Sequence, residues 1–242
     1  MIVPVDHPSK NVLEGTHCKL EKLSRDLHYE ILYDVVMMEP ERFLYLPRYP
    51  HPNKEDYHAW FGNILNGSHV YYVVWSKPLQ QYTGILSFMR IERTHGVIEI
   101  GDILWSSLMS RTTVATETIY LLLSYAIDGL GYRRVEWKCD SRNLPSSRAA
   151  VRFGFSFEGI FRQHMIVKGR NRDTAWYSLL DHEWRGDSTS SVSLRSGYEA
   201  WLASSNFDET GKQIFPLSHF LRPLSSSEDG RESGREGEEQ DV

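Results

Sequence analysis

The spacing of apolar residues changes from a helical to a strand period near residue 70, and this change constrains the fold more than any other feature. Apolar side chains recur at helical spacing over 25–38 and 54–66, on either side of a proline-rich connection. Three strand-like segments separated by turn-forming residues follow directly, at 70–75, 83–91 and 97–105. The pattern predicts neighbouring strands of one sheet with helices packed on it.

Helical and strand periods alternate in the next part of the chain. The pattern predicts two helices that end near glycines, at 115–129 and 146–153. It predicts three strands, at 132–140, 155–167 and 174–184. A short alternating segment at 17–23 adds one strand before the first helix. The order β-αα-βββ-α-β-α-ββ predicts an α/β (α+β) fold with a mixed central sheet of about seven strands and flanking helices.

The remaining residues divide into a lead-in and two C-terminal parts. Residues 1–16 are polar with two prolines and indicate a loose N-terminal lead-in to a folded domain over 17–185. Residues 186–224, with a polar linker and a short helix at 197–205, are expected to form a C-terminal extension packed on that domain. Residues 225–242 are poor in apolar side chains, and we expect a disordered acidic tail.

The formal charge is unevenly distributed along the 242 residues. The tail 225–242 holds seven acidic and two basic residues, so it accounts for the whole net charge of −5. The rest of the chain is neutral overall, which disfavours a globally basic nucleic-acid binder and a polybasic membrane-surface protein. Region 131–172 is locally basic, with ten basic and three acidic residues, and is able to attract an anionic ligand.

Several other classes of protein are disfavoured. No apolar run approaches the roughly 18–20 residues of a membrane span, and the first twenty residues hold no apolar signal-peptide core. The two cysteines, Cys18 and Cys139, lie far apart, which fits a reducing, cytoplasmic setting. No cluster of cysteine and histidine has zinc spacing, so we expect no metal.

The segment S-R-T-T-V-A-T-E at 110–117 joins a predicted strand to a predicted helix. The first backbone N–H groups of a helix have no intrahelical partner, and the helix dipole adds positive charge there. The segment is therefore a natural seat for a phosphate or pyrophosphate, with Arg111 as an added cation. Ordinary hydroxyl capping of the helix is the structural alternative.

A second informative segment is D-S-R-N-L-P-S-S-R-A-A-V-R-F-G-F at 140–155. Asn143 ends a strand, Ser146 stands at a plausible N-cap, and Gly154 stands where a helix C-cap needs a left-handed residue. Capping explains each of these residues individually, and their joint spacing points to more than capping.

Five short motifs stand in a fixed order between residues 99 and 162. They are E-I-G at 99–101, A-T-E at 115–117, L-G-Y-R-R-V-E-W-K at 130–138, N-x-x-S at 143–146 and R-F-G-F-x-F-E-G-x-F-R at 152–162. In this order and spacing they resemble the GNAT acetyltransferases, and within them the RimJ/RimL-like branch. A later motif, W-L-x-x-x-N-F-D-x-x-G-x-Q at 201–213, resembles a tail of one subgroup. The resemblance covers roughly Gly15 to Leu217.

The resemblance implies a GNAT fold over 17–185, acetyl-CoA as cosubstrate and an amine as acceptor. It implies that a bulge in the fourth predicted strand, 97–105, splays two parallel strands apart for the pantetheine arm. The implied cofactor-binding residues are Leu104 and Trp105 in that strand, the pyrophosphate loop with Arg111, Thr112, Thr113, Val114, Ala115 and Thr116, and Asn143 near the thioester.

The resemblance also implies the catalytic residues. Glu99 is the first candidate for the base that deprotonates the amine, and Asp102 is the second. Alternation places these two side chains on opposite faces of the strand unless a bulge intervenes. A backbone N–H of the bulged strand would bind the oxyanion. Ser146 would protonate the departing thiolate, with no covalent enzyme intermediate.

The sequence departs from the family pattern in two places. The loop pattern Q/R-x-x-G-x-G/A falls on Leu108, Arg111 and Thr113, so the first residue and both glycines are absent. Glycine allows a close backbone approach, and a charge-assisted bond from Arg111 is one replacement for it. The tyrosine that many family members use as general acid falls on Ala150, which leaves Ser146 for that role.

Three hypotheses follow from these residues. The first is an acetyl-CoA-dependent N-acetyltransferase, cytoplasmic and monomeric or homodimeric, with no nucleic-acid, membrane or metal partner. Its acceptor is open: a peptide amino terminus, a lysine or a small-molecule amine. The second is a catalytically reduced GNAT-like module that binds acyl-CoA or protein. The third is a nucleic-acid binder that uses region 131–172. This region has no recognisable motif of aromatic residues interleaved with basic side chains, which speaks against nucleic-acid binding.

Overall fold

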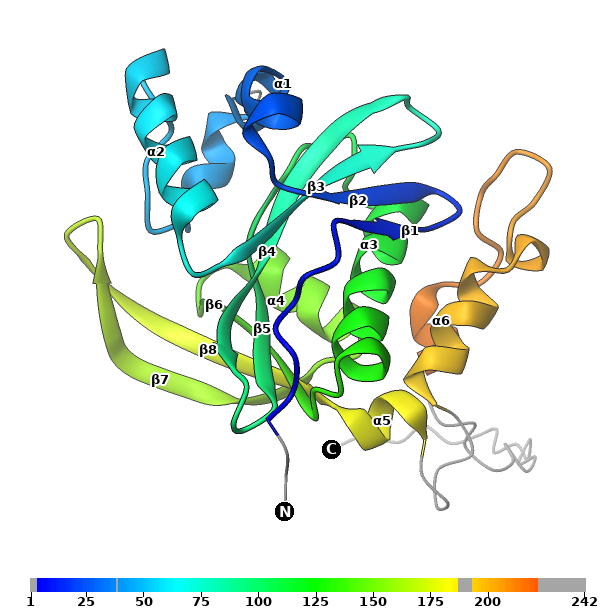
Figure 1. Ribbon diagram of the computed structural model, residues 1–242. Coiled ribbons are helices and arrows are strands. Elements are labelled where there is room, and N and C mark those ends of the chain that lie inside the picture. The colour runs from blue at the N-terminus through cyan, green and yellow to red at the C-terminus, as the bar shows by residue number, and fades with distance from the viewer. Residues whose placement is uncertain (1–3, 38, 187–192, 222–242) are drawn as a thin grey trace, which may run out of the picture.

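The computed structural model describes residues 4–37, 39–186 and 193–221. Eight strands form one mixed sheet in the order β1-β2-β3-β4-β5-β6-β8-β7, with helices on both faces (Figure 1). Every neighbouring pair is antiparallel except β5 and β6, which are parallel. The strands are β1 (Val12–Glu14), β2 (Cys18–Lys22), β3 (Val70–Ser76), β4 (Gln81–Glu92), β5 (Val97–Trp105), β6 (Arg134–Asp140), β7 (Ser156–Val167) and β8 (Arg170–Leu180).

Helices follow the strands in the order that the periodicity predicts. The π-helix η2 (Tyr125–Gly129) continues the third α-helix, and two 3₁₀ turns, η1 (Pro40–Phe43) and η3 (Ser204–Asn206), lie in connections. The α-helices are α1 (Arg25–Met37), α2 (Lys54–Asn66), α3 (Thr113–Ser124), α4 (Leu144–Arg152), α5 (Asp181–Arg185), α6 (Leu194–Leu202) and α7 (Leu217–Leu221).

Two separate apolar cores lie on the two faces of the sheet. The smaller core joins α1, α2 and η1 to one face, and the larger core joins α3, η2, α4 and α6 to the other. In β3, Tyr71 and Val73 enter the smaller core, while Tyr72 and Val74 enter the larger one. The continuous apolar run 70–75 therefore reflects a strand that is covered on both faces.

The expectation of about seven strands and of a loose lead-in over 1–16 is corrected by β1. Leu13 is buried in the larger core and pairs with Leu20 of β2, so the lead-in contributes an edge strand. The carboxylate of Glu117 on α3 fixes the turn between the two strands, because it accepts hydrogen bonds from the backbone N–H groups of Thr16, His17 and Cys18 at 2.8, 2.6 and 2.8 Å.

The end of the predicted strand 174–184 is also corrected, because residues 181–185 form α5. The Glu183 carboxylate accepts a hydrogen bond from the Leu180 N–H at 2.7 Å and starts the helix. Trp184 is fully buried and donates its indole N–H to Asp128 at 2.9 Å. A short helix anchored by a buried tryptophan thus replaces the last residues of the predicted strand.

The part of the C-terminal extension that the structure describes, 193–221, packs through α6 against α3 and α5. Tyr198 is buried and donates its hydroxyl proton to the Phe153 carbonyl at 2.9 Å. Helix α6 begins at Leu194, three residues before the predicted helix 197–205, because Ser193 caps it. The acidic tail 225–242 lies outside the described residues.

Candidate active site

The two parallel strands at the centre of the sheet separate part of the way along their length. Their recorded pairing ends at Glu99 opposite Glu136, although β5 runs on to Trp105 and β6 runs on to Asp140. Each strand keeps its antiparallel neighbour beyond that point. The edge of β5 that faces β6 is therefore open to another hydrogen-bonding partner, at the place where the resemblance implies a pantetheine arm.

A β-bulge in β5 accompanies this separation. Ile85 and Ser87 of β4 pair with Leu104 and Gly101, so three steps of β5 stand opposite two steps of β4. Asp102 lies inside the bulge with φ of +50°, a left-handed conformation that non-glycine residues seldom adopt. The bulge that the resemblance implies for strand 97–105 is present.

The bulge brings Glu99 and Asp102 to the same face of the sheet. Ile100 before the bulge and Ile103 after it both pack on the larger core, although they are three residues apart. The alternation of the strand is thus reversed by one residue. Both carboxylates consequently point to the face that carries α1 and α2.

Glu99 is buried and lies between two cations. Its Oε2 is 2.7 Å from Arg90 Nη1 and 2.8 Å from Lys138 Nζ. Lys138 also pairs with Glu136 at 2.6 Å, and its Nζ is 3.9 Å from the centre of the Trp176 ring. The other oxygen of Glu99 faces Gly101, since a Cβ on that glycine would come within 3.1 Å of Oε1. The carboxylate therefore presents Oε1 to the bulge.

Asp102 is held by two partners from other elements. Its carboxylate accepts hydrogen bonds from the guanidinium of Arg48, in the connection between α1 and α2, and from the hydroxyl of Tyr71 on β3. Burial raises the pKa of Tyr71, and the charge of Asp102 raises it further, so the hydroxyl remains a hydrogen-bond donor.

The N-terminus of α3 follows β5 directly. Thr112 is the N-cap, and its Oγ1 accepts a hydrogen bond from the Ala115 N–H at 3.3 Å. The N–H groups of Thr113 and Val114 belong to the first turn and have no intrahelical acceptor. Arg111 is exposed and has φ of +63°, so the position where the family pattern has a glycine adopts a left-handed conformation here, which glycine would tolerate without strain. The capping and the anion-seat interpretations of this segment are compatible.

The other predicted loop residues are directed into the protein. The side chains of Val114 and Ala115 belong to the larger core. The hydroxyl of Thr116 is buried and accepts a hydrogen bond from Arg152 Nη2 at 2.9 Å. These three residues offer a ligand their backbone rather than their side chains.

Leu104 and Trp105 also use their side chains for packing. Leu104 lies in the smaller core, and half-buried Trp105 packs on the larger one. Opposite Trp105, Gly84 of β4 allows a close approach, because a Cβ there would stand 2.4 Å from the Trp105 Cβ. The backbone at the end of β5 is thus the part that remains for a ligand.

Asn143 and Ser146 are linked to each other at the start of α4. Asn143 is the N-cap, and its Oδ1 accepts a hydrogen bond from the Ser146 N–H at 3.2 Å. Trp137 of β6 donates its indole N–H to Ser146 Oγ at 3.0 Å, which leaves the serine its own proton to donate. Since Trp137 belongs to the larger core, Ser146 approaches the separated strands from the face opposite to Glu99.

Sequence patterns missed the partners that hold the two carboxylates. Arg48 lies in the aperiodic stretch Pro47–Pro50, where no spacing marks a functional residue. Lys138 was part of the basic region 131–172, and nothing in that count distinguished it from its neighbours. Its place two residues from Glu136 on a strand was the available signal, because alternation puts both on one face.

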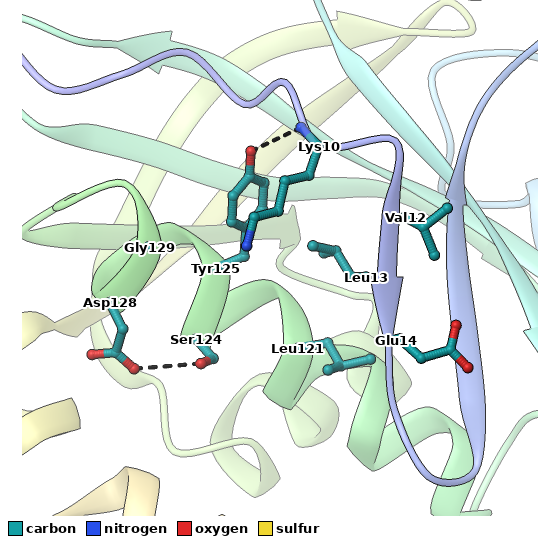
Figure 2. Close-up of a pocket in the computed structure, with 9 residues that line it drawn as sticks. All are labelled: Lys10, Val12, Leu13, Glu14, Leu121, Ser124, Tyr125, Asp128 and Gly129. Carbon is teal, nitrogen blue, oxygen red and sulfur yellow. Dashed lines mark hydrogen bonds between the residues drawn. The ribbon is translucent and has the colours of Figure 1, made fainter.

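A separate hollow of about 380 Å³ lies between the N-terminal segment and the helix formed by α3 and η2 (Figure 2). There the Tyr125 hydroxyl accepts the Lys10 N–H at 3.0 Å, and Ser124 donates to Asp128 at 3.4 Å. None of the predicted site residues lines this hollow.

No helix within residues 4–37, 39–186 and 193–221 is both long enough and apolar enough to cross a membrane.

Comparisons with known proteins agree with this geometry. The chain is 42% identical to a GCN5-related N-acetyltransferase from Brucella melitensis, whose crystal structure it matches with a TM-score of 0.84 over 90% of this chain and 97% of that one. It is 30% identical to an uncharacterized N-acetyltransferase, p20, from Bacillus licheniformis, over 46% of this chain. That alignment spans 61% of the relative's own length.

A third likeness concerns the fold alone. A RimL ribosomal L7/L12 alpha-N-protein acetyltransferase, solved in complex with coenzyme A, superposes with a TM-score of 0.59 over 70% of this chain and 98% of that one, at 23% identity. The family model described as an acetyltransferase (GNAT) domain matches residues 19–156, more than half of the chain. The resemblance is thereby confirmed, and the chain belongs to the GNAT family of acetyltransferases.

Proposed function

We propose that the protein is an acetyl-CoA-dependent N-acetyltransferase of the RimJ/RimL-like branch, which moves an acetyl group from the thioester to a primary amine by direct attack. One observation carries the proposal: β5 and β6 stop pairing after Glu99, beside the bulge at Asp102, which leaves a gap between the two parallel strands at the centre of the sheet. The family membership and the coenzyme A in the RimL structure support the same cosubstrate.

The residues at the end of β5 and the start of α3 fit this cosubstrate. The open edge of β5 offers backbone groups of Leu104 and Trp105 to the amide groups of pantetheine. The free N–H groups of Thr113 and Val114 suit a pyrophosphate, and exposed Arg111 adds a cation beside them. Thr112, Ala115, Thr116 and Asn143 keep that surface in shape, through the two helix caps and the buried first turn of α3.

The acetyl thioester supplies an activated carbonyl, and the protein supplies proton transfers. In the proposed reaction Glu99 takes a proton from the ammonium through a water at Oε1, because Oε2 is engaged by Arg90 and Lys138. The neutral amine forms the new C–N bond as the C–S bond breaks. A backbone N–H at the bulge donates to the carbonyl oxygen while negative charge develops on it.

Ser146 completes the proton balance from the other face of the sheet. Its Oγ is fixed by the Trp137 indole, and its own proton is available for the departing thiolate. After the C–N bond forms, the nitrogen loses its second proton by the same route through the water and Glu99. Glu99 returns both protons to solvent and Ser146 recovers one, so each turnover releases one proton. No cysteine is needed, which fits the positions of Cys18 and Cys139, both free and buried.

A catalytically reduced module that binds acyl-CoA or protein is the second candidate. Two observations favour it: the missing glycines at Arg111 and Thr113, and the ion pairs that engage one oxygen of Glu99. The left-handed φ at Arg111 weakens the first of these, since it shows that this loop reaches a conformation open to glycine with an arginine at that position.

Calorimetric titration with acetyl-CoA and an assay of acetyl-CoA consumption decide between the candidates. The assay uses panels of peptides with free amino termini, lysine peptides and small amines, under the reducing conditions of a cytoplasmic protein. Binding together with turnover on one panel supports the enzyme. Binding without turnover on any panel supports the binding module. If millimolar acetyl-CoA produces no heat and no thermal shift, the enzyme and the acyl-CoA-binding module are both contradicted, and a protein-binding module is left.

A further inference from the structure

Three neighbouring side chains bury nitrogen atoms that have no hydrogen-bond partner within the described residues. The atoms are Arg48 Nε and Nη2, His51 Nε2 and Trp60 Nε1. The His51 and Trp60 rings are 4.8 Å apart, and the Arg48 guanidinium is 5.3 Å from the centre of the Trp60 ring. The three side chains therefore form one group, which we name the Arg48 cluster.

Positive charge gathers beside the Arg48 cluster. Lys168, at the tip of the β7–β8 hairpin, donates to the Phe43 carbonyl at 2.6 Å and lies 4.6 Å from the centre of the Tyr49 ring. Burial lowers the pKa of Lys168, and the charge of Arg48 lowers it further. In the described part of the chain, Asp102 is the carboxylate in contact with Arg48, and Asp56 is the acid whose charge acts on His51.

The Arg48 cluster stands on the same face of the sheet as Glu99. Arg48 bonds to Asp102, which shares that face because of the bulge. The connection that carries Arg48 and His51 is also fixed beside the end of β5, since Glu39 Oε1 accepts the Ser107 N–H at 2.6 Å. The cluster thus borders the region from which an amine would reach the separated strands.

Unpartnered buried N–H groups are costly, and native proteins seldom keep them without a reason. A carboxylate is suited to this group because it has two acceptor oxygens and a charge that balances the second cation. We propose that Arg48, His51 and Trp60 form an anion-recognition site that selects acceptor amines bearing a carboxylate. The source of that carboxylate is either a free amino acid or an acidic side chain next to a peptide amino terminus.

This inference rests on the proposed acetyl transfer, because it assigns the acceptor of that reaction. The nitrogen atoms are buried, so an acceptor reaches them only after surrounding side chains move. The Arg48–Asp102 ion pair offers one positive and one negative group, which complement an acceptor that carries both a carboxylate and an ammonium. Such an acceptor places its carboxylate on Arg48 and brings its ammonium towards the two carboxylates on this face.

The test measures binding separately from turnover. The protein saturated with CoA is titrated calorimetrically with matched ligands: glutamate-first and glutamine-first tripeptide amides, and amino acids with their decarboxylated amines. The carboxylate member of at least one pair is expected to bind about tenfold or more tightly, the usual effect of a charge-assisted hydrogen bond. The pair that shows the preference distinguishes a peptide acceptor from a free amino acid.

Two variants and two matched controls assign the preference to residues. Arg48→Met is expected to abolish it, and Trp60→Phe, which removes one N–H and keeps a ring, is expected to reduce it. Arg93→Met, in the β4–β5 turn, and Trp75→Phe on β3 are expected to leave it unchanged. Thermal melting confirms that each variant is folded, and Trp60→Phe keeps the test valid if Arg48→Met is not.

Each outcome has one meaning. Equal affinity for both members of every pair overturns the inference, and so does a preference that survives both variants. A loss of CoA affinity in Arg48→Met assigns the cluster to the cofactor and also overturns it. A carboxylate preference in binding without acetylation of any amine supports the anion site and contradicts the proposed acetyl transfer instead.

Discussion

At the scale of single residues, Ser146 and Ser147 form a matched pair in the first turn of α4. Ser146 Oγ is bonded to the Trp137 indole, and Ser147 Oγ lies 3.4 Å from the Cys139 sulfur. If Ser146 protonates the thiolate, Ser146→Ala lowers kcat by about 10²-fold, a typical contribution of general acid catalysis. Steady-state kinetics measure it, and calorimetry is expected to show unchanged CoA affinity. An equal loss of kcat in Ser147→Ala contradicts the assignment.

Glu99 and Asp102 make a second residue-scale prediction, because both face the acceptor side. Glu99→Gln is expected to lower kcat by about 10²-fold or more, since it removes the proposed base. Asp102→Asn is expected to act mainly on the KM of the acceptor, because Asp102 holds Arg48 in place. Kinetics of both variants with one acceptor measure the difference. A larger kcat loss in Asp102→Asn reverses the two roles.

The residues predicted from the sequence were those in short, position-specific motifs. The N-x-x-S spacing placed Asn143 and Ser146 together, because the cap of a helix fixes their distance. Arg48 and Tyr71 were missed for physical reasons. Arg48 reaches Asp102 across 54 residues from a connection without periodicity, and Tyr71 occupies a strand whose two faces are both apolar. Contacts of that kind depend on the folded sheet.

At the scale of elements, the close approach of β4 and β5 beside the bulge predicts the effect of a substitution at Gly84, with Gly62 of α2 as a control. Gly84→Ala is expected to destabilise the protein by about 1–3 kcal/mol, because its Cβ would stand 2.4 Å from the Trp105 Cβ. Gly62→Ala in α2 meets no atom within 4 Å and is expected to stabilise by about 0.5–1 kcal/mol. Urea unfolding measures both. Equal stability of the two variants contradicts this account of the bulge.

The connection between the β1–β2 turn and α3 gives a second prediction at this scale. Glu117 accepts hydrogen bonds from three backbone N–H groups, which Glu117→Ala leaves without this acceptor in the β1–β2 turn. The expected cost is about 3 kcal/mol or more in the free energy of unfolding. Glu117→Gln keeps one oxygen acceptor and is expected to cost less. Urea unfolding compares the two, and a loss below about 1 kcal/mol for alanine contradicts the prediction.

Elements with a strong period were predictable, and those fixed by distant partners were not. The helix 54–66 and the strand 97–105 agree with α2 and β5, because each has several turns or alternations of its own. Strand β1 has three residues and exists through its pairing with β2 and the burial of Leu13. Helix α5 has five residues and depends on the burial of Trp184. Neither signal extends over enough residues to show a period.

At the scale of the whole molecule, three of the ten basic side chains in region 131–172 are engaged in ion pairs. Arg134 binds Glu136 and Glu158, Lys138 binds Glu99 and Glu136, and Arg142 binds Asp140. The other seven bases form no ion pair among the described residues, so the region keeps an excess of positive charge. Exposed Arg111, at the start of α3, is better placed to contribute to cofactor affinity.

The same pairing predicts how the protein responds to acid. Glu158 of edge strand β7 binds Arg134 of β6 through both oxygens at 2.6 Å, and Ser178 of the intervening β8 donates to it at 2.7 Å. The hydrogen bonds from Arg134 lower the pKa of Glu158 to about 2. Because the folded pKa lies below the unfolded value of about 4.3, this carboxylate stabilises the fold above that pH. The contribution is lost as the pH falls towards 2.

Glu158→Gln tests this link between the edge of the sheet and its centre. The variant is expected to lose less stability than the natural chain between pH 5 and pH 3, because it has no carboxylate to protonate at this position. Urea unfolding at both pH values measures the difference, with Glu209→Gln, a carboxylate in an exposed turn, as control. Glu158 is exposed on one side, so the effect is smaller than that of a buried pair. Parallel pH profiles for the natural chain and Glu158→Gln would show that the pairing with Arg134 does not secure β7 to the sheet.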